Sequence, residues 1–299
     1  METALPIFIS PCAQARLAHP SGECGIAAAA AKANLVYCVS NNASMTVEEI
    51  SGAADTGVLW WQLYVQDNRD ISAKMLRRIQ APGMRYSAVV VTLDAPVPGK
   101  READLAQGGV GKQLFAGTSA SLVWEDLEWV RERWSGPLVL KGLQTWEDVV
   151  LAAKAGVQGV ILSNHGGRAL DGVAPAVLVL LEVRKYAPWV FGVLEVMVDG
   201  GVRRGTDVMK CVALGARAVG VGRPALWGLA GYGSAGVGKV LEILGDEVET
   251  AVRLLGEKGV EDVRGKKACV NARRVEGWVW EGEGEGEGPD GVAGLKAKL

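Results

Sequence analysis

A run of apolar residues in the middle of the chain ends directly in a cluster of chemically active side chains. The run, residues 159–162, is followed by a serine, an asparagine, His165, two glycines and Arg168. An imidazole exchanges protons near neutral pH, and a guanidinium can hold an anion with two parallel hydrogen bonds. Glycines allow the backbone to approach a ligand closely. We interpret this stretch as a buried strand that presents a base and an anion-binding group to a site; an ordinary turn after a core strand is the alternative.

Short runs of β-type residues, each ending in small or polar residues, recur along the whole chain. The eight predicted strands span residues 6–10, 35–40, 58–63, 88–93, 138–141, 160–163, 194–198 and 219–222. Segments of helical character lie between them, at residues 25–33, 46–53, 71–80, 125–134, 146–155, 176–185 and 206–214, and a further helix is predicted at 237–255. This alternation predicts an α/β fold, a (β/α)8 TIM barrel. A doubly wound open sheet is the alternative, but it would gather polar residues at one switch point.

A barrel of this kind places its chemistry at the carboxyl ends of the strands and often binds a phosphate after strands seven and eight. The seventh predicted strand is followed by Asp199, Gly200 and Gly201, and the eighth ends in Gly222 and is followed by Arg223 and the opening of a helix. Backbone N–H groups, the positive end of a helix and a guanidinium together would hold a phosphate. The sequence therefore predicts a phosphate-bearing cofactor, with two tight turns as the alternative.

The remaining predicted strands carry polar residues at the same end. These residues are Ser40, Gln62 with Tyr64, Thr92 with Asp94, and Lys141. Each one alone is typical of a helix cap or a solvated loop. Their shared position at one end of the predicted barrel makes them candidates for one site.

The string S-N-H-G-G-R-x-L-D, residues 163–171, resembles the signature of the FMN-dependent 2-hydroxy-acid oxidising enzymes. This family includes glycolate oxidase, lactate oxidase and the flavin domain of flavocytochrome b2, and the similarity extends from about Pro6 to about Arg274. The resemblance implies FMN as the cofactor and a small L-2-hydroxy acid, of the lactate or glycolate type, as the substrate that is oxidised to the 2-oxo acid. Oxygen or another redox partner would accept the electrons, and the protein would form a homo-oligomer.

The resemblance also implies a role for each candidate residue. His165 matches the catalytic base, and Asp94 matches the carboxylate that stabilises its protonated form. The substrate-binding set is Tyr64, Arg101, His165 and Arg168, of which Arg168 pairs with the substrate carboxylate. Lys141 would stabilise negative charge on the reduced flavin. The cofactor-binding positions are Ala13, Ser40, Gln62, Thr92, Lys141, Ser163, Asp199, Gly200, Gly201, Arg203, Gly222 and Arg223.

The chain also departs from the family pattern. The family's N-terminal segment, which supplies a further substrate-binding tyrosine, has no counterpart before the first predicted strand, and the loop after Gly99 looks shortened. Cys12 and Asn42 replace residues that are threonine-like and tryptophan in glycolate oxidases. A truncated, catalytically impaired FMN-binding paralogue is therefore one alternative function. A non-redox FMN barrel such as an isomerase is another, although Arg168 and its neighbours suit a carboxylate substrate.

Composition excludes several other classes of protein. The net charge of −2 argues against a nucleic-acid or membrane-surface partner, and no apolar run reaches the ~20 residues that a membrane helix needs. The five cysteines form no C-x-x-C pair, which suits free thiols in a reducing compartment better than disulfides or a metal site. We therefore expect a protein without a bound metal.

The last part of the chain differs from the rest in composition. We predict a barrel domain over residues 1–275, followed by a low-complexity Gly/Glu tail over residues 276–299 that cannot bury a core. The final residues, Ala297, Lys298 and Leu299, resemble the S-K-L type of peroxisomal address. The sequence therefore predicts a peroxisomal location, with a cytoplasmic location and a chance match of the tripeptide as the alternative.

Overall fold

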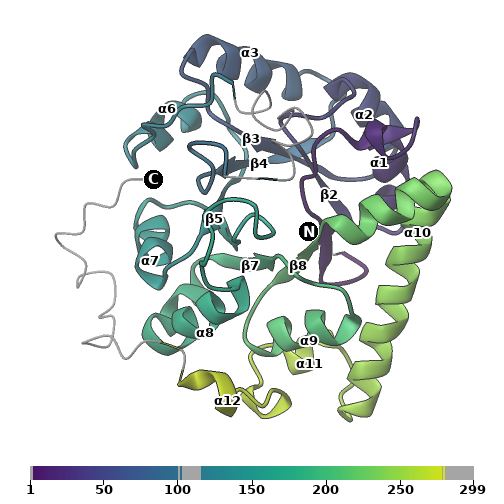
Figure 1. Ribbon diagram of the computed structural model, residues 1–299, viewed down its shortest axis with the longest axis vertical. Helices are drawn as coiled ribbons and strands as arrows, with labels where there is room; N and C mark the ends of the chain where they lie inside the picture. Colours follow the sequence, from purple (N-terminus) through teal and green to yellow (C-terminus); the bar gives the residue numbers. More distant parts are fainter. Residues whose placement is uncertain (1–2, 100–101, 103–115, 278, 280–299) are drawn as a thin grey trace.

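Eight parallel strands form one closed barrel, in which each strand pairs with the next and β8 pairs with β1 (Figure 1). The computed structural model describes residues 3–99, 102, 116–277 and 279. The strands are β1 (Ile7–Ile9), β2 (Val36–Val39), β3 (Leu59–Leu63), β4 (Tyr86–Thr92), β5 (Leu138–Leu143), β6 (Gly159–Leu162), β7 (Glu195–Asp199) and β8 (Ala218–Val221). The predicted TIM barrel and its eight strands are confirmed, and the open sheet is excluded because the barrel closes.

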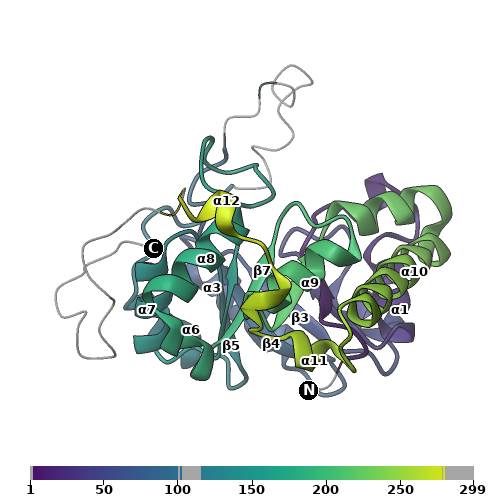
Figure 2. The same ribbon diagram turned by 90° about the horizontal axis from the view of Figure 1, so that it is seen from below.

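Helices surround the barrel on its outside (Figure 1; Figure 2). The longer ones are α1 (Gly22–Lys32), α2 (Val47–Ala53), α3 (Arg69–Ile79), α6 (Asp126–Arg131), α7 (Trp146–Lys154), α8 (Ala176–Tyr186), α9 (Gly205–Ala213) and α10 (Arg223–Leu254). Short helices α11 (Val260–Val263) and α12 (Arg273–Glu276) follow. The predicted division at residue 275 stays a prediction, because most of the tail lies outside the described residues.

One helix differs from its prediction. The sequence predicts a helix opening after Gly222 and a helix over 237–255, but the structure joins the two in α10, which begins at Arg223 and packs against α1 and α9 (Figure 1). Its backbone leaves helical geometry at Tyr232 and Gly233, where Gly233 has a φ of 59°. The first part of α10 contains four glycines, at 228, 231, 233 and 236, and glycine is a poor helix former that hides the apolar period.

The strands alternate their side chains between the surrounding helices and the barrel interior, as the two-residue period of a strand requires. The interior side chains form an apolar group, the floor cluster, which consists of Phe8, Val36, Cys38, Val90, Val139, Ile161 and Met197. Buried polar residues follow at the carboxyl end: six lie two positions after a floor residue, and Gln62 lies two positions after Trp60, which packs against the floor cluster. We call them the rim residues: Ser10, Ser40, Gln62, Thr92, Lys141, Ser163 and Asp199.

Three further observations on the described residues concern membrane helices, cysteines and metal ligands. No helix in the described part of the chain is long and apolar enough to cross a membrane. The five cysteines are free thiols, and the described residues contain no group of three or more His, Cys, Asp or Glu side chains arranged to hold a metal ion.

Candidate active site

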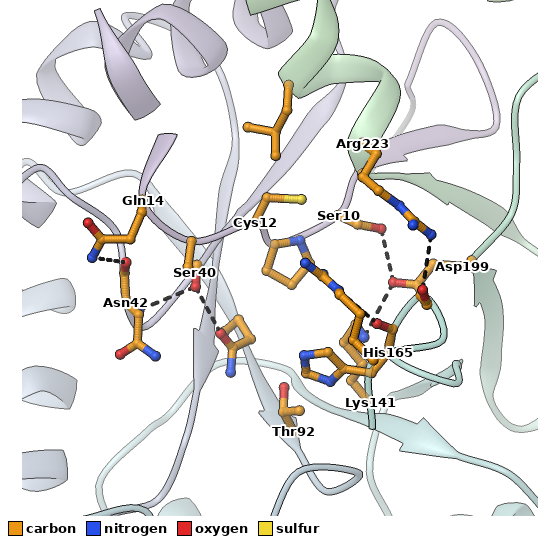
Figure 3. Close-up of a pocket in the computed structure, with 18 of the residues that line it drawn as sticks. Ser10, Cys12, Gln14, Ser40, Asn42, Thr92, Lys141, His165, Asp199 and Arg223 are labelled. Carbon is orange, nitrogen blue, oxygen red and sulfur yellow. Dashed lines mark hydrogen bonds and ion pairs between the residues drawn. The ribbon is translucent and has the colours of Figure 1, made fainter. Parts of the chain in front are cut away.

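A cavity of about 820 Å³ opens at the carboxyl ends of the strands (Figure 3). It is lined by most of the predicted site residues, namely Ala13, Ser40, Gln62, Tyr64, Thr92, Lys141, His165, Arg168, Asp199, Gly200, Gly201, Arg203, Gly222 and Arg223. Asp94 and Ser163 lie directly behind this lining, each in contact with a residue that belongs to it. Arg101 lies outside the described residues. The structure therefore brings together every predicted site residue that it describes.

His165 is held in place from three directions. Its backbone has a φ of 59°, in the left-handed region that few residues other than glycine adopt, and its N–H donates to Ser163 Oγ at 3.0 Å. The ring nitrogen Nδ1 lies 2.8 Å from Asp94 Oδ1, and Nε2 lies 3.4 Å from the hydroxyl of Tyr64. Because Asp94 binds Nδ1 and fixes the orientation of the ring, Nε2 is the ring nitrogen that faces the hydroxyl of Tyr64.

Asp94 is buried as an anion behind the imidazole. Burial alone would raise the pKa of its carboxyl, but the positive charge of Lys141 and the hydrogen bond with His165 outweigh burial and hold that pKa below its ordinary value. A carboxylate in this position orients the ring and stabilises its protonated form. The pair therefore has the geometry of a base with a charged supporting partner.

A glycine in β5 makes room for Asp94. The pairing of β5 with β6 shifts register between Lys141 and Leu143, and Gly142 at this bulge has a φ of 99°. A Cβ atom on Gly142 would lie 2.5 Å from Asp94 Cγ. Pairing resumes beyond the bulge, where Leu143 pairs with Leu162, so β5 continues past its predicted end at residue 141.

Lys141 is a buried cation surrounded by polar partners. Its Nζ donates to Ser163 Oγ at 2.9 Å and lies 3.4 Å from Asp199 Oδ2, which also accepts from the hydroxyl of Ser10 at 3.0 Å. Burial would lower the pKa of this ammonium, but the carboxylates of Asp199 and Asp94 raise it above its ordinary value. The cavity therefore contains a permanent positive charge next to the imidazole (Figure 3).

Three polar atoms of the rim are buried without a hydrogen-bond partner among the described residues. They are Gln62 Nε2, Thr92 Oγ1 and Asp199 Oδ1, and all three residues line the cavity. A buried polar atom that makes no hydrogen bond costs free energy of folding. The donors and acceptors left open here fit a polar ligand with several hydrogen-bonding groups.

The far end of the cavity has the features of an anion site. Gly200 and Gly201 both have positive φ values, of 98° and 78°, and turn the chain after β7. Arg223 begins α10, and its guanidinium donates to the carbonyl of Gly166 at 3.0 Å. The N–H groups and the dipole at the start of a helix favour a phosphate in this position.

Comparison with known proteins agrees with this geometry. The family model described as FMN-dependent dehydrogenase matches residues 1–114 and 110–271. The chain belongs to the FMN-dependent dehydrogenase family. The resemblance seen in the sequence is thereby confirmed, and FMN is the cofactor of the family.

Named relatives and solved structures support the same membership. 2-Hydroxyacid oxidase 2 of Mus musculus is 43% identical over 281 residues, which cover 88% of this chain and 78% of the relative. Peroxisomal (S)-2-hydroxyacid oxidase GLO4 of Arabidopsis thaliana is 41% identical, with 86% and 76% covered. L-lactate dehydrogenase (cytochrome) of Wickerhamomyces anomalus is 40% identical, and the match covers 88% of this chain but about half, 49%, of that longer protein.

The fold of the flavin-binding domain of baker's yeast flavocytochrome b2 superposes with a TM-score of 0.83 at 36% identity, covering 94% of this chain and 75% of that one. A mandelate oxidase variant with (S)-mandelic acid superposes with a TM-score of 0.80 at 38% identity, covering 88% and 77%. Family members of this fold therefore share the barrel that positions the cavity.

The cavity of this chain fits the family's cofactor on its own residues. The open hydrogen-bonding atoms of Gln62, Thr92 and Asp199 suit the polar edge of a flavin ring and the hydroxyls of its ribityl chain. The start of α10 with Arg223 suits the phosphate. The site therefore has both a polar wall and a phosphate end for FMN.

Several lining residues escape prediction from the sequence. Ser10 lines the cavity and binds Asp199, and its position two residues after Phe8 in β1 was the signal that could have revealed it. Gln14 and Leu17 follow in the same loop, and Trp227 lies at the mouth on α10. Trp227 is 76% exposed, and nothing in the sequence pattern distinguishes it as a lining residue.

Proposed function

We propose that this protein uses FMN to oxidise a small L-2-hydroxy acid, of the lactate or glycolate type, to the 2-oxo acid. The observation that carries the proposal is the His165–Asp94 pair beside the buried Lys141 cation, at a cavity that also contains Arg168. The relatives named as 2-hydroxyacid oxidases and L-lactate dehydrogenase support the same reaction class.

In this proposal His165 accepts a proton from the substrate. Asp94 stabilises the imidazolium that results, because its carboxylate lies 2.8 Å from Nδ1 and keeps its negative charge. Tyr64 supplies a hydroxyl close to Nε2, and Arg168 binds the substrate carboxylate with its guanidinium. Arg101, which the family resemblance adds to this set, lies outside the described residues.

The remaining site residues would hold FMN, which when bound accepts the two electrons of the oxidation. Lys141 would stabilise the negative charge that the ring gains. Ser40, Gln62, Thr92 and Ser163 would bind the ring and the ribityl chain, together with the backbone at Ala13. The ribityl and phosphate end would be held by Asp199, Gly200, Gly201, Arg203, Gly222 and Arg223.

The visible absorption spectrum of the purified protein under anaerobic conditions tests the proposal. We expect a flavin spectrum that bleaches when L-lactate, glycolate or a longer L-2-hydroxy acid is added. A protein that binds no flavin would contradict the cofactor. A flavin that stays oxidised with all of these acids would instead favour the catalytically impaired paralogue.

We also propose a peroxisomal location, oxygen as the electron acceptor and a homo-oligomeric state. The Arabidopsis thaliana relative is named as a peroxisomal oxidase. Ala297, Lys298 and Leu299, which lie outside the described residues, resemble a peroxisomal address. Peroxisomes dispose of hydrogen peroxide, which favours oxygen there. A fluorescent reporter carrying the last twelve residues should become punctate, whereas a diffuse signal would favour the cytoplasm.

A further inference from the structure

Glu23 is a fully buried carboxylate that none of the proposed roles uses. It lies in the first turn of α1, and 0% of the residue is exposed. Its Oε1 accepts from the backbone N–H of Ala15 at 3.0 Å and from that of Ser44 at 2.9 Å. Its Oε2 accepts from the hydroxyl of Ser44 at 2.7 Å. One side chain therefore joins two loops, the one after β1 and the one after β2.

An anion in this position is costly unless its environment replaces the water it has lost. The three donors to Glu23 are neutral groups, two backbone N–H groups and a hydroxyl. The positive end of α1 adds a favourable field. These hydrogen bonds offset burial of the carboxylate, and in return they fix the backbone of both loops at the points where they bind.

The two joined loops form one wall of the cavity. Cys12, Ala13 and Gln14 of the first loop line it, as do Ser40 and Asn42 of the second (Figure 3). The backbone N–H of Gln14 donates to the carbonyl of Asn42 at 3.3 Å, which is a second direct tie between the loops. The wall therefore depends on contacts between loops that belong to neighbouring strands.

Ser44 extends the same connection to a third point. Its hydroxyl oxygen accepts from the backbone N–H of Arg16 at 3.0 Å while its proton goes to Glu23. Glu23 and Ser44 together hold the backbone at residues 15, 16 and 44. A chain held at three points behind the wall has little freedom to shift at the front.

We propose that Glu23 is a positioning residue that keeps the Cys12–Gln14 and Ser40–Asn42 wall in the shape that FMN requires. A site whose walls are fixed before the ligand arrives binds more tightly, because binding then orders fewer groups. The inference rests on the proposed function in so far as FMN is the ligand. It adds a residue that acts through the loops, without itself lining the cavity.

Titration of the FMN-free protein with FMN, followed by flavin fluorescence, tests the inference in three variants. We expect Glu23→Ala to raise the Kd for FMN about tenfold or more, because it leaves the two N–H groups without an acceptor. Ser44→Ala should raise the Kd less, since it removes only the hydroxyl. Glu23→Gln keeps one carbonyl oxygen for both N–H groups, so its Kd should stay within about threefold of wild type.

Arg184→Met provides a matched control for general loss of stability. Arg184 also joins two loops, by donating to the carbonyls of Leu214 at 2.9 Å and Gly265 at 2.5 Å, but these loops lie at the opposite end of the barrel. We expect this variant to lower the melting temperature of the protein without changing the Kd for FMN. A Kd that rises in Arg184→Met as much as in Glu23→Ala would overturn the positioning role.

The remaining outcomes separate this inference from the proposed function. Wild-type protein that binds no FMN would contradict the proposed function itself. Wild-type protein that binds FMN, together with unchanged Kd values in Glu23→Ala and Ser44→Ala, would overturn only the role of Glu23. If Glu23→Ala does not fold, Ser44→Ala decides: a raised Kd supports the role, and an unchanged one overturns it.

Discussion

The floor cluster and the rim residues are equally buried, yet they differ in chemistry. In β6, Ile161 of the floor is 0% exposed and Ser163 of the rim is 1% exposed; in β5, Val139 and Lys141 are both 4% exposed. The floor is entirely apolar, whereas the rim contains an ion pair and three buried polar atoms without a partner among the described residues. Burial therefore does not distinguish the two regions, but polarity does.

The floor cluster therefore serves the stability of the barrel, and the rim residues serve a ligand. Burial of apolar side chains in the floor stabilises the barrel. Burial of unpaired polar atoms in the rim destabilises it, and a ligand that binds those atoms recovers the loss. A substitution in the floor should therefore change stability with little change in ligand affinity, and a substitution in the rim should change ligand affinity or the reaction.

His165→Gln in the site should slow the reaction strongly. Glutamine cannot act as the base, so we expect substrate to reduce the flavin about 10⁴-fold more slowly, while FMN stays bound. Stopped-flow measurement of flavin reduction checks this. His19→Gln is the matched control, because His19 contacts Ser21 and should leave the rate unchanged. Normal reduction in His165→Gln would show that another group is the base.

The next effect is on stability, from Ile161→Ala in the floor. Removing a fully buried isoleucine leaves a cavity and should lower the free energy of unfolding by about 2–5 kcal/mol. Chemical denaturation measures this loss. We expect the folded fraction to bind FMN with an affinity close to that of wild type. A large loss of affinity without a loss of stability would contradict the division between floor and rim.

Thr92→Val in the rim should raise stability slightly, whereas Ile161→Ala lowers it. Valine has nearly the shape of threonine and lacks the buried hydroxyl that has no partner in the described part of the chain. We expect the FMN-free protein to gain up to about 1 kcal/mol of stability and to bind FMN several-fold more weakly. Thr118→Val removes another such hydroxyl outside the main cavity, so it should change stability alone. Equal FMN affinity in the two variants would contradict a role for the Thr92 hydroxyl.

Asp94 should make a small contribution to the pH dependence of stability. The folded state holds the pKa of this carboxyl below its ordinary value of about 3.9, so its contribution is complete above that pH and is lost as the pH falls through the lower, folded-state pKa. The stability difference between wild type and Asp94→Asn should therefore shrink in acid, with a slope of at most about one proton. Denaturation midpoints measured from neutral pH to about pH 3 check this. A difference that stays constant would mean that the folded state does not shift this pKa.

Much of the barrel and of its site follows from the two-residue period of the strands. Apolar runs that end in polar residues indicate eight strands, and the glycines after β7 and β8 indicate an anion site. The two-residue period does not reveal backbone dihedral angles or shifts in strand register. The left-handed backbone of His165 and the bulge at Gly142 were therefore not predictable. Glu23 was not predictable either, because a glutamate in the first turn of a helix usually lies in solvent and interacts with the helix dipole. Only the folded loops show that it is buried.

The pairing of β8 with β1 has a consequence for the way the protein is made. The hydrogen bond from Ser10 to Asp199 joins residues 189 positions apart, and Arg223 lies beyond the last strand. A growing chain therefore cannot complete the cavity until β8 has left the ribosome and closed the barrel on β1. Binding of FMN should therefore require a chain synthesised beyond β8, and nascent chains halted before β8 should not bind FMN.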